Sequence, residues 1–443
     1  MKIAFIGGGS LTWGPELVTD LALMPALQGA EVWLQDIDGA ALERMAPLAR
    51  TICEQAGSRM RVEATLEREP ALRGADYVIY SVGIGGLAGM RADLEIPERY
   101  GIRQPVGCNV GPGGLNRALR HIPATIELCR QMEAWCPAAW LLNLTNPLTQ
   151  LCRAATRETS IRTIGLCHEL THFGSRLSGL LGVPEEEIRF RALGINHLPW
   201  VLEFKAGERD GFALLRAWLA EHGPLACAQD ALLNTPWSVF MDRLGVKLTI
   251  FQDTGCLPGA GDRHVAEFFP HFLRPETHWG LDYGVECTTV AHRAETYAME
   301  AEQVQCWLSG EDRLPMKPSP EQVAALIAAL AGAESGRFIV NVPNEGQAPN
   351  LPPRYVVECF AQVDAQGVHP EPGGPLPPLP AAVCNWHLSA MELTVEAAVT
   401  GDRGLALQAL RMDPAVREWE RAEPMLAEMV RACAEWLPQF CDA

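Results

Sequence analysis

A glycine turn near the N-terminus is the feature that most constrains how this chain folds. An apolar run at residues 2–6 leads into the Gly-Gly-Gly-Ser turn of residues 7–10, and leucines at helical spacing follow. A second apolar run, residues 31–35, ends in Asp36. Strand, glycine turn, helix, strand and acid, in this order, predict the first unit of a dinucleotide-binding fold.

The residue types at this turn suit a dinucleotide. Gly7 and Gly9 occupy the first two glycine positions of the G-x-G-x-x-G pattern, where they let the backbone approach a pyrophosphate at a helix N-terminus. The third position holds Thr12, and a purely structural turn is the alternative. Asp36 can accept hydrogen bonds from ribose hydroxyls, and an Asp at this point favours NAD over NADP.

Further apolar runs predict a sheet. Strand-like segments that end in a glycine or polar turn lie at residues 77–82, 139–144, 161–166 and 192–197. We therefore predict an α/β protein, with a Rossmann-type doubly wound parallel sheet in residues 1–165 packed on a mixed α+β catalytic domain in residues 166–443. No Pro- or Ser-rich linker marks the boundary, which indicates two closely packed parts.

The ends of two of these strands carry a candidate metal site. Cys167 directly follows the segment 161–166, and His197 closes the segment 192–197. A thiolate and an imidazole suit a divalent metal in a site left partly open for substrate. The alternative is that both are ordinary core or solvated residues. The nucleotide signature elsewhere in the chain favours the catalytic interpretation.

Two other polar positions are candidates for the same cleft. Asn146 precedes a proline, which biases it towards extended backbone, and its amide can reach a ligand; a plain turn is the alternative. A glycine-rich loop ends in Asp262 and two further ionisable residues. His264, His271 and His278 are seven residues apart, but prolines interrupt the stretch, so we interpret these histidines as structural or solvated.

The amino-acid composition limits which binding partners and which cellular compartment suit this chain. The 443 residues carry a formal charge of -18, which argues against nucleic acid and anionic membranes, since both reward basic patches. We find neither a signal-peptide pattern nor an apolar stretch long enough to span a bilayer. The fourteen cysteines have no framework spacing and no CxxC pair, so we expect reduced thiols and a cytoplasmic protein.

A series of motifs along nearly the whole chain resembles glycoside hydrolase family four. In order, they are Ile-Gly-Gly-Gly-Ser, Leu-Gln-Asp-Ile-Asp, Gly-Pro-Gly-Gly, Asn-Leu-Thr-Asn-Pro, Gly-Leu-Cys-His, Gly-Ile-Asn-His, Gly-Asp-Arg-His and Arg-Phe-Ile-Val-Asn-Val-Pro-Asn-Glu-Gly. The family comprises NAD- and divalent-metal-dependent glycosidases, related in fold to lactate and malate dehydrogenases. The resemblance is to the branch that contains α-glucosidases, α-galactosidases and α-glucuronidases.

The resemblance implies a role for each candidate residue. NAD would be held by Gly7, Gly9, Ser10 and Asp36. Cys167 and His197 match the family's metal ligands, commonly for Mn(II), and Asn146 matches its sugar-binding Asn. Asp262 matches the base that removes the C2 proton in members acting on unphosphorylated glucosides. The alternative for Asp262 is a structural role, as an Asx turn or an ion pair with Arg263.

The implied reaction is hydrolysis of a hexopyranoside through oxidation and elimination. NAD takes hydride from C3 of the sugar, and the resulting ketone acidifies the C2 proton. The metal stabilises the enediolate that forms when a base removes this proton. The C1 leaving group is eliminated, water adds, and the hydride returns, so NAD is recycled within each turnover. The resemblance also implies a homodimer or homotetramer.

The residues after Cys167 leave the proton donor open. Some family members have an Asp next to this cysteine as the general acid, whereas this chain has His168 and Glu169. His168 can donate a proton to the leaving group or bind a substrate hydroxyl, and Glu169 can orient the metal site. Members acting on 6-phosphosugars typically replace His168, which favours an unphosphorylated substrate.

Two other functions fit parts of the sequence. One is an NAD-dependent sugar or 2-hydroxy-acid dehydrogenase with net release of NADH. The other is an NAD-sensing binding protein, which leaves the metal pair and Asp262 without a purpose. A dehydrogenase of this kind would normally use a catalytic His paired with a carboxylate, and an Arg for a carboxylate substrate, instead of a Cys/His pair.

Overall fold

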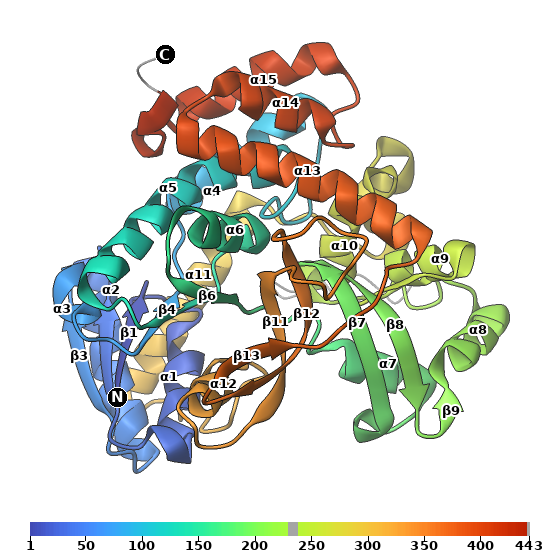
Figure 1. The fold of residues 1–443 in the computed structure, drawn as a ribbon. Coiled ribbons are helices and arrows are strands. Elements are labelled where there is room, and N and C mark those ends of the chain that lie inside the picture. The colour runs from blue at the N-terminus through green and yellow to red at the C-terminus, as the bar shows by residue number, and fades with distance from the viewer. Residues whose placement is uncertain (229–237, 441–443) are drawn as a thin grey trace.

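The N-terminal part of the molecule is a parallel sheet, drawn in blue to green in Figure 1. The computed structural model describes residues 1–228 and 238–440. The parallel strands are β1 (Lys2–Ile6), β2 (Glu31–Gln35), β3 (Arg61–Thr65), β4 (Tyr77–Tyr80), β5 (Trp140–Asn143) and β6 (Arg162–Gly165). Their spatial order, β3-β2-β1-β4-β5-β6, is that of a dinucleotide-binding fold. The predicted α/β class and Rossmann-type sheet are therefore confirmed.

Burial explains why these segments form strands. Ile3 and Phe5 of β1 and Ile79 of β4 are fully buried, as expected for parallel strands covered by helices on both faces. The helices of this part are α1 (Gly14–Leu23), α2 (Gly39–Gln55), α3 (Arg68–Leu72), α4 (Gly86–Arg99), α5 (Gly111–Trp135) and α6 (Leu148–Glu158). The carboxyl ends of the strands are left as the edge at which polar loops gather.

The same sheet continues into an antiparallel half. β11 (Gly336–Pro343) pairs with β6 through Asn341 and Gly165, and β12, β7, β8 and β10 follow in space. The other strands are β7 (Ile188–Ile195), β8 (Leu198–Ala206), β9 (Arg209–Asp210), β10 (Leu257–Pro258), β12 (Val356–Asp364) and β13 (Gly367–Pro370). The pairing direction therefore changes next to Gly165, the last residue of the predicted nucleotide-binding part.

Helices of the second half pack on the antiparallel strands and on helices of the N-terminal part. They are α7 (Phe173–Leu181), α8 (Gly211–His222), α9 (Gly245–Thr254), α10 (Asp262–Phe268), α11 (Val290–Ser309), α12 (Val323–Leu330), α13 (Pro378–Thr400), α14 (Arg403–Met412) and α15 (Trp419–Ala432). The C-terminal helices, red in Figure 1, lie over α4, α5 and α6. Leu119, Leu151, Val395 and Met425 share one apolar core there, so the two parts are closely packed.

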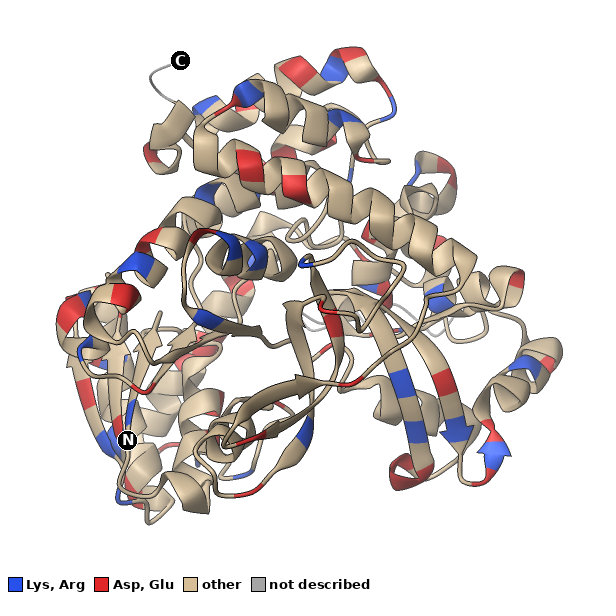
Figure 2. Ribbon diagram, viewed as in Figure 1, with Lys and Arg blue, Asp and Glu red and all other residues tan. Residues whose placement is uncertain are grey.

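The stretch of residues 370–380 is rich in proline, and α13 begins within it, at Pro378. A proline at the first helical position loses no hydrogen bond and already has a helical φ. Acidic and basic residues are interspersed over the outer helices (Figure 2). Within residues 1–228 and 238–440, no helix is long and apolar enough to cross a membrane. Most of the described cysteines are buried, such as Cys53, Cys129 and Cys384.

Candidate functional site

The glycine turn is held against the end of β2. The N–H of Gly7 donates to the Gln35 carbonyl oxygen at 2.8 Å, and the N–H of Gly9 donates to Asp36 Oδ2 at 3.0 Å. Gly7 has a φ of +88°, and a Cβ there would lie 1.9 Å from the carbonyl oxygen of Ser81. Only glycine fits this position. The fold thus brings three of the predicted cofactor-binding residues, Gly7, Gly9 and Asp36, onto one turn.

The departure from the glycine pattern at Thr12 has a structural reason. Thr12 donates its hydroxyl hydrogen to Glu300 Oε2 of α11 at 2.5 Å, so the turn is tied to a helix of the second half. Ser10, the fourth predicted cofactor residue, accepts a hydrogen bond on Oγ from the N–H of Trp13 at 3.2 Å. Ser10 therefore lies at the entrance to α1, beside the glycines.

One group of metal-ligating side chains converges at the carboxyl edge of the sheet. Single donor atoms of Cys108, His197 and His264 all lie within 4.8 Å of one another. Cys108 comes from the loop before α5, His197 from the turn between β7 and β8, and His264 from α10. The two imidazole rings are 3.8 Å apart, centre to centre. His197 has a φ of +66°, an unusual backbone conformation of the kind that clusters at functional sites.

The protonation states of this group suit a divalent cation. Burial, together with the neighbouring His264, holds the pKa of His197 well below its usual range. Burial also lowers the pKa of His264, so both imidazoles are neutral and offer lone pairs. Nδ1 of His264 is buried and has no hydrogen-bond partner in the described part of the chain. Burial raises the pKa of the Cys108 thiol to about 12, and a coordinated metal would displace this proton. The residues present therefore fit a metal ion.

Cys167 lies in the same polar cluster but outside this group of three. It is buried at the end of β6, and the side chain of Asn196, the residue before His197, hydrogen-bonds to it. Burial, followed by the charges of Glu358 and Glu169, raises the pKa of the Cys167 thiol well above its usual value. Asn196 also donates to Glu358 Oε2 at 2.9 Å. The predicted pair, Cys167 and His197, is therefore connected through Asn196.

Glu169 joins several of these side chains. Its Oε2 accepts a hydrogen bond from the N–H of Gly261 at 2.8 Å and pairs with Arg176 at 3.1 Å. Its Oε1 lies 3.4 Å from Nε2 of His264 and 3.7 Å from Nε2 of His168. Burial opposes its charge, but His264, Arg176 and His168 hold the pKa of Glu169 well below its usual range. Glu169 is therefore a carboxylate that fixes the imidazoles around it.

His168 faces the nucleotide turn. Its ring centre lies 5.5 Å from that of Trp13, and its Nδ1 lies 3.0 Å from Glu321 Oε1. The side chain is 33% exposed, compared with 12% for His264, so His168 is the more accessible of these two imidazoles. Burial opposes the charged form, but Glu321 and Glu169 raise the pKa of His168 above its usual value. A protonated, accessible imidazole can act as a proton donor.

Asp262 is buried at the start of α10 and caps α9. Its Oδ2 accepts from the N–H of Val246 at 2.7 Å, and its Oδ1 accepts from the N–H of Lys247 at 3.1 Å. These amides belong to the first turn of α9, whose dipole favours a carboxylate. Burial and the neighbouring Asp242 raise the pKa of Asp262 to about 7. The described partners of Asp262 are thus α9 amides and Lys247, and a pKa near neutrality suits a general base.

Asn146 lies at the carboxyl end of β5, where a cis peptide bond joins it to Pro147. Its carbonyl oxygen accepts a hydrogen bond from Nε of Arg117 at 3.0 Å, and its Oδ1 accepts from the N–H of Leu148 at 3.3 Å. The side-chain amide nitrogen donates no hydrogen bond to the described residues and can donate one to a ligand.

Sequence reasoning missed two members of the central group. His264 was predicted to be structural or solvated, yet it contacts both His197 and Glu169. The prediction holds better for His278, which is exposed and pairs with Asp282. Cys108 was not singled out, although it stands in a polar loop directly before the Gly-Pro-Gly-Gly motif. That position next to a ligand-facing glycine loop was the available signal.

Comparisons with known proteins agree over nearly the whole chain. A model described as family 4 glycosyl hydrolase matches residues 2–183, and a model of the family's C-terminal domain matches residues 192–416. An alpha-galacturonidase of Bacillus subtilis (strain 168) is 33% identical, covering 97% of this chain and 97% of that protein.

Solved structures show the same similarity. The crystal structure of lplD from Bacillus subtilis superposes with a TM-score of 0.89 at 32% identity, covering 97% of this chain and 99% of that one. A 6-phospho-alpha-glucosidase from gut microorganisms, solved in complex with NAD and Mn2+, has a TM-score of 0.81 at 21% identity, with 99% of each chain covered. At that identity the second likeness concerns the fold alone.

Proposed function

The chain belongs to glycosyl hydrolase family 4, and from this premise we propose that it hydrolyses an unphosphorylated hexopyranoside by transient oxidation at C3 followed by elimination across C1 and C2. The observation that carries the proposal is the convergence of Cys108, His197 and His264 beside a dinucleotide-type glycine turn. A metal-binding cluster and a nucleotide site at one edge of a sheet suit a reaction that needs both.

The proposed cofactors are NAD and a divalent metal ion such as Mn(II). Gly7, Gly9, Ser10 and Asp36 would hold NAD. His197 would ligate the metal together with one thiolate, for which Cys167 is the candidate by family resemblance and Cys108 the candidate by proximity. When bound, NAD supplies a reversible hydride acceptor, and the metal supplies positive charge next to the sugar oxygens.

The protein's own residues would handle the protons. The Asp262 carboxylate, with a pKa of about 7, would take the proton from C2 of the sugar, while the α9 amides keep its position fixed. Nε2 of His168 would donate a proton to the leaving oxygen at C1, since Glu321 holds the ring from its other side. Glu169 would orient both His168 and His264, and Asn146 would donate to a sugar hydroxyl.

The substrate class is proposed from the relatives. An alpha-galacturonidase of Bacillus subtilis is 33% identical over 97% of this chain, which supports an α-linked hexuronide as the substrate here. His168, in the position that 6-phosphosugar members typically replace, supports an unphosphorylated sugar. A dehydrogenase is the second candidate, and it shares the Rossmann-type sheet, but it leaves the cysteine and histidine cluster without a role.

An activity screen tests the proposal. The full-length enzyme would be assayed on 4-nitrophenyl α- and β-hexosides, including galacturonides, galactosides and 6-phosphates, with Mn(II), NAD and a thiol reductant. Parallel reactions would omit NAD or metal. We expect aglycone release that needs both additions and leaves no net NADH. Net NADH without aglycone release would establish the dehydrogenase instead.

We also propose that residues 1–165 and 166–443 serve as the nucleotide-binding and catalytic parts, since the sheet changes pairing direction beside Gly165. A homodimer or homotetramer is the proposed assembly, which light scattering after size-exclusion chromatography would measure. Buried cysteines such as Cys53, Cys129 and Cys384, which form no disulfide, support a reducing compartment such as the cytoplasm.

A further inference from the structure

Two arginines beside the site lack an ion-pair partner in the described part of the chain. Neither Arg263 nor Arg293 takes part in an ion pair among the described residues, although the chain as a whole carries a charge of -18. Arg263 follows Asp262 on α10, and Arg293 lies in the first turn of α11. Arg176 and Arg243, by contrast, pair with Glu169 and Glu286.

Both guanidinium groups lie against the same aromatic ring. Their central carbons are 4.8 Å and 5.0 Å from the centre of the Phe240 ring. Burial, and next to it the charge of Arg293, lowers the pKa of Arg263. The two like charges therefore act on each other, and an anion bound beside them would offset their repulsion.

Arg263 also has an unused donor. Its Nη2 donates to the carbonyl oxygen of Pro105 at 3.1 Å and to the hydroxyl of Thr288 at 2.5 Å. Its Nε is buried and has no hydrogen-bond partner among the described residues. A buried N–H without a partner costs free energy, and an added acceptor would recover it. Both hydrogen-bond acceptors of Nη2 are neutral, and the carboxylates of Glu169 and Glu267 act on the Arg263 charge without forming an ion pair with it.

The position of the two arginines relative to the nucleotide turn limits which ligand they can bind. Glu300 of α11 holds Thr12 of that turn, and Arg293 precedes Glu300 by seven residues. Two helical turns place Arg293 about 10 Å from that contact, on the same side of the helix. Arg263 stands between Asp262 and His264, and its charge acts on Cys108 and His197. The pair therefore lies between the nucleotide turn and the cysteine and histidine cluster, where a substrate would bind.

We propose that Arg263 and Arg293 bind the carboxylate of a hexuronide substrate and select it over the neutral hexoside, an inference that rests on the proposed glycosidase function. The fork of a guanidinium group matches the planar carboxylate and forms charge-assisted hydrogen bonds with it. Nε of Arg263 would be one donor, from inside the site. Arg293, beside the exposed ring of Tyr297, would be the other, at the solvent side.

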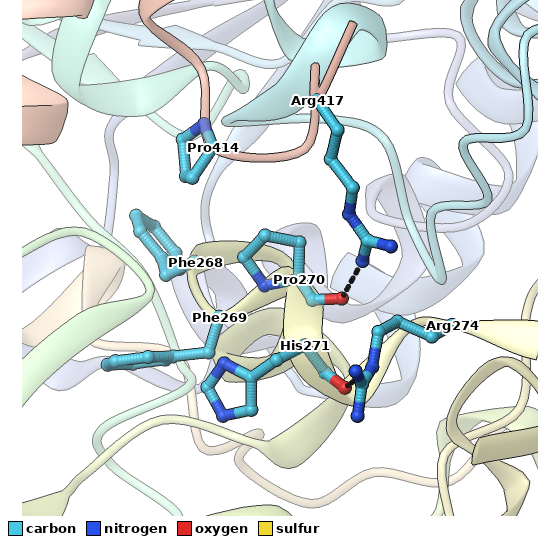
Figure 3. Close-up of a pocket in the computed structure, with 7 residues that line it drawn as sticks. All are labelled: Phe268, Phe269, Pro270, His271, Arg274, Pro414 and Arg417. Carbon is cyan, nitrogen blue, oxygen red and sulfur yellow. Dashed lines mark hydrogen bonds between the residues drawn. The ribbon is translucent and has the colours of Figure 1, made fainter. Parts of the chain in front are cut away.

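A second cationic group on the surface is a weaker candidate. Figure 3 shows a pocket of about 470 Å³ lined by Phe268, Phe269, Pro270, His271, Arg274, Pro414 and Arg417. Arg417 donates to the carbonyl oxygen of Pro270 at 3.2 Å and Arg274 donates to that of His271 at 2.9 Å, so both arginines already have acceptors. This pocket includes none of the proposed catalytic residues, and Arg417 therefore serves as a control.

The test compares two substrates that differ only at C6. The kcat/KM of wild type, R293Q, R293K and the control R417Q would be measured on 4-nitrophenyl α-galacturonide and on the matching α-galactoside. We expect R293Q to lose roughly 10- to 100-fold on the galacturonide and to change little on the galactoside. R293K should lose less, because it keeps the charge but not the fork. R417Q should leave the ratio of the two substrates unchanged.

Several results would overturn the inference. An equal loss on both substrates would show that Arg293 has only a structural role. No loss on either substrate in R293Q would show that Arg293 does not select the carboxylate. A wild type that prefers the galactoside would also overturn the inference, but it would leave the proposed glycosidase function intact. If NAD affinity falls in R293Q, the pair binds cofactor phosphate instead, so the dissociation constant of NAD would be measured in parallel.

A binding measurement keeps the inference testable if neither substrate is hydrolysed. Calorimetry would then compare D-galacturonate with D-galactose as ligands of the wild type and R263K. We expect galacturonate to bind more tightly than galactose, and this difference to shrink in R263K while the thermal midpoint stays near that of the wild type. Equal binding of both sugars by the wild type would contradict the inference independently of catalysis.

Discussion

Metal binding should release a proton, because the candidate thiols are protonated in the folded chain. Burial raises the pKa of Cys108 to about 12 and that of Cys167 well above its usual value. The two imidazoles are neutral and release none. One thiolate ligand therefore means one proton lost per metal ion, and the apparent dissociation constant falls about tenfold for each unit of rising pH. With two thiolate ligands, the apparent dissociation constant would fall about a hundredfold for each unit of rising pH.

The measurement is calorimetric titration of the chelator-treated enzyme with Mn(II), in buffers of different ionisation enthalpy. A range of about pH 8 to 9 lies above the pKa of about 7 of the nearby carboxyls Asp262 and Glu358, so these groups stay ionised throughout. We expect one proton per ion. The variants Cys108→Ser and Cys167→Ser then identify the thiolate ligand, because proton release disappears only when the cysteine that binds the metal is replaced. A dissociation constant independent of pH would refute thiolate ligation altogether.

Three other predictions follow from individual contacts in the structure. Asp262→Asn should lower kcat by about 10² to 10⁴, and the wild-type kcat/KM should fall as pH drops through about 7, because the base must be ionised; the variant should lack this acid limb. Asp36→Ala should weaken NAD binding about tenfold or more by fluorescence titration, since Asp36 Oδ2 holds the N–H of Gly9. Arg120→Ala should destabilise the protein by about 3–5 kcal/mol in denaturant unfolding, because it leaves Asp93 buried and unpaired, whereas the exposed Arg91→Ala should cost less than about 1 kcal/mol.

The N-terminal sheet was predictable because its signals are local. A glycine turn, an apolar strand and an acid at the next strand end are encoded within one short segment, so Gly7, Gly9 and Asp36 were identified and do meet. The pairing of the strands in the second half was harder to predict from the sequence. β11 joins β6 through Asn341 and Gly165, residues far apart in the chain, and a strand pattern does not specify its neighbour.

The polar side chains at the strand ends could be identified from the sequence, but the residues that they contact could not. His197 was predicted as a ligand from its position after β7, and the structure surrounds it with Cys108 and His264. His264 belongs to α10, and its contact with His197 depends on how that helix packs. The histidine spacing suggested a structural role because it was judged along the chain, where prolines interrupt it.

The sequence by itself therefore determined the class of fold, the nucleotide turn and the chemical types available at the carboxyl edge of the sheet. Only the tertiary structure decided which of them meet: Cys108 with His197 and His264, Glu169 with Arg176, and Asp262 with the first turn of α9. The physical reason is the distance along the chain over which each kind of interaction acts. Strand and turn preferences act between neighbours in the chain, whereas a site is fixed by the packing of segments that the sequence keeps far apart.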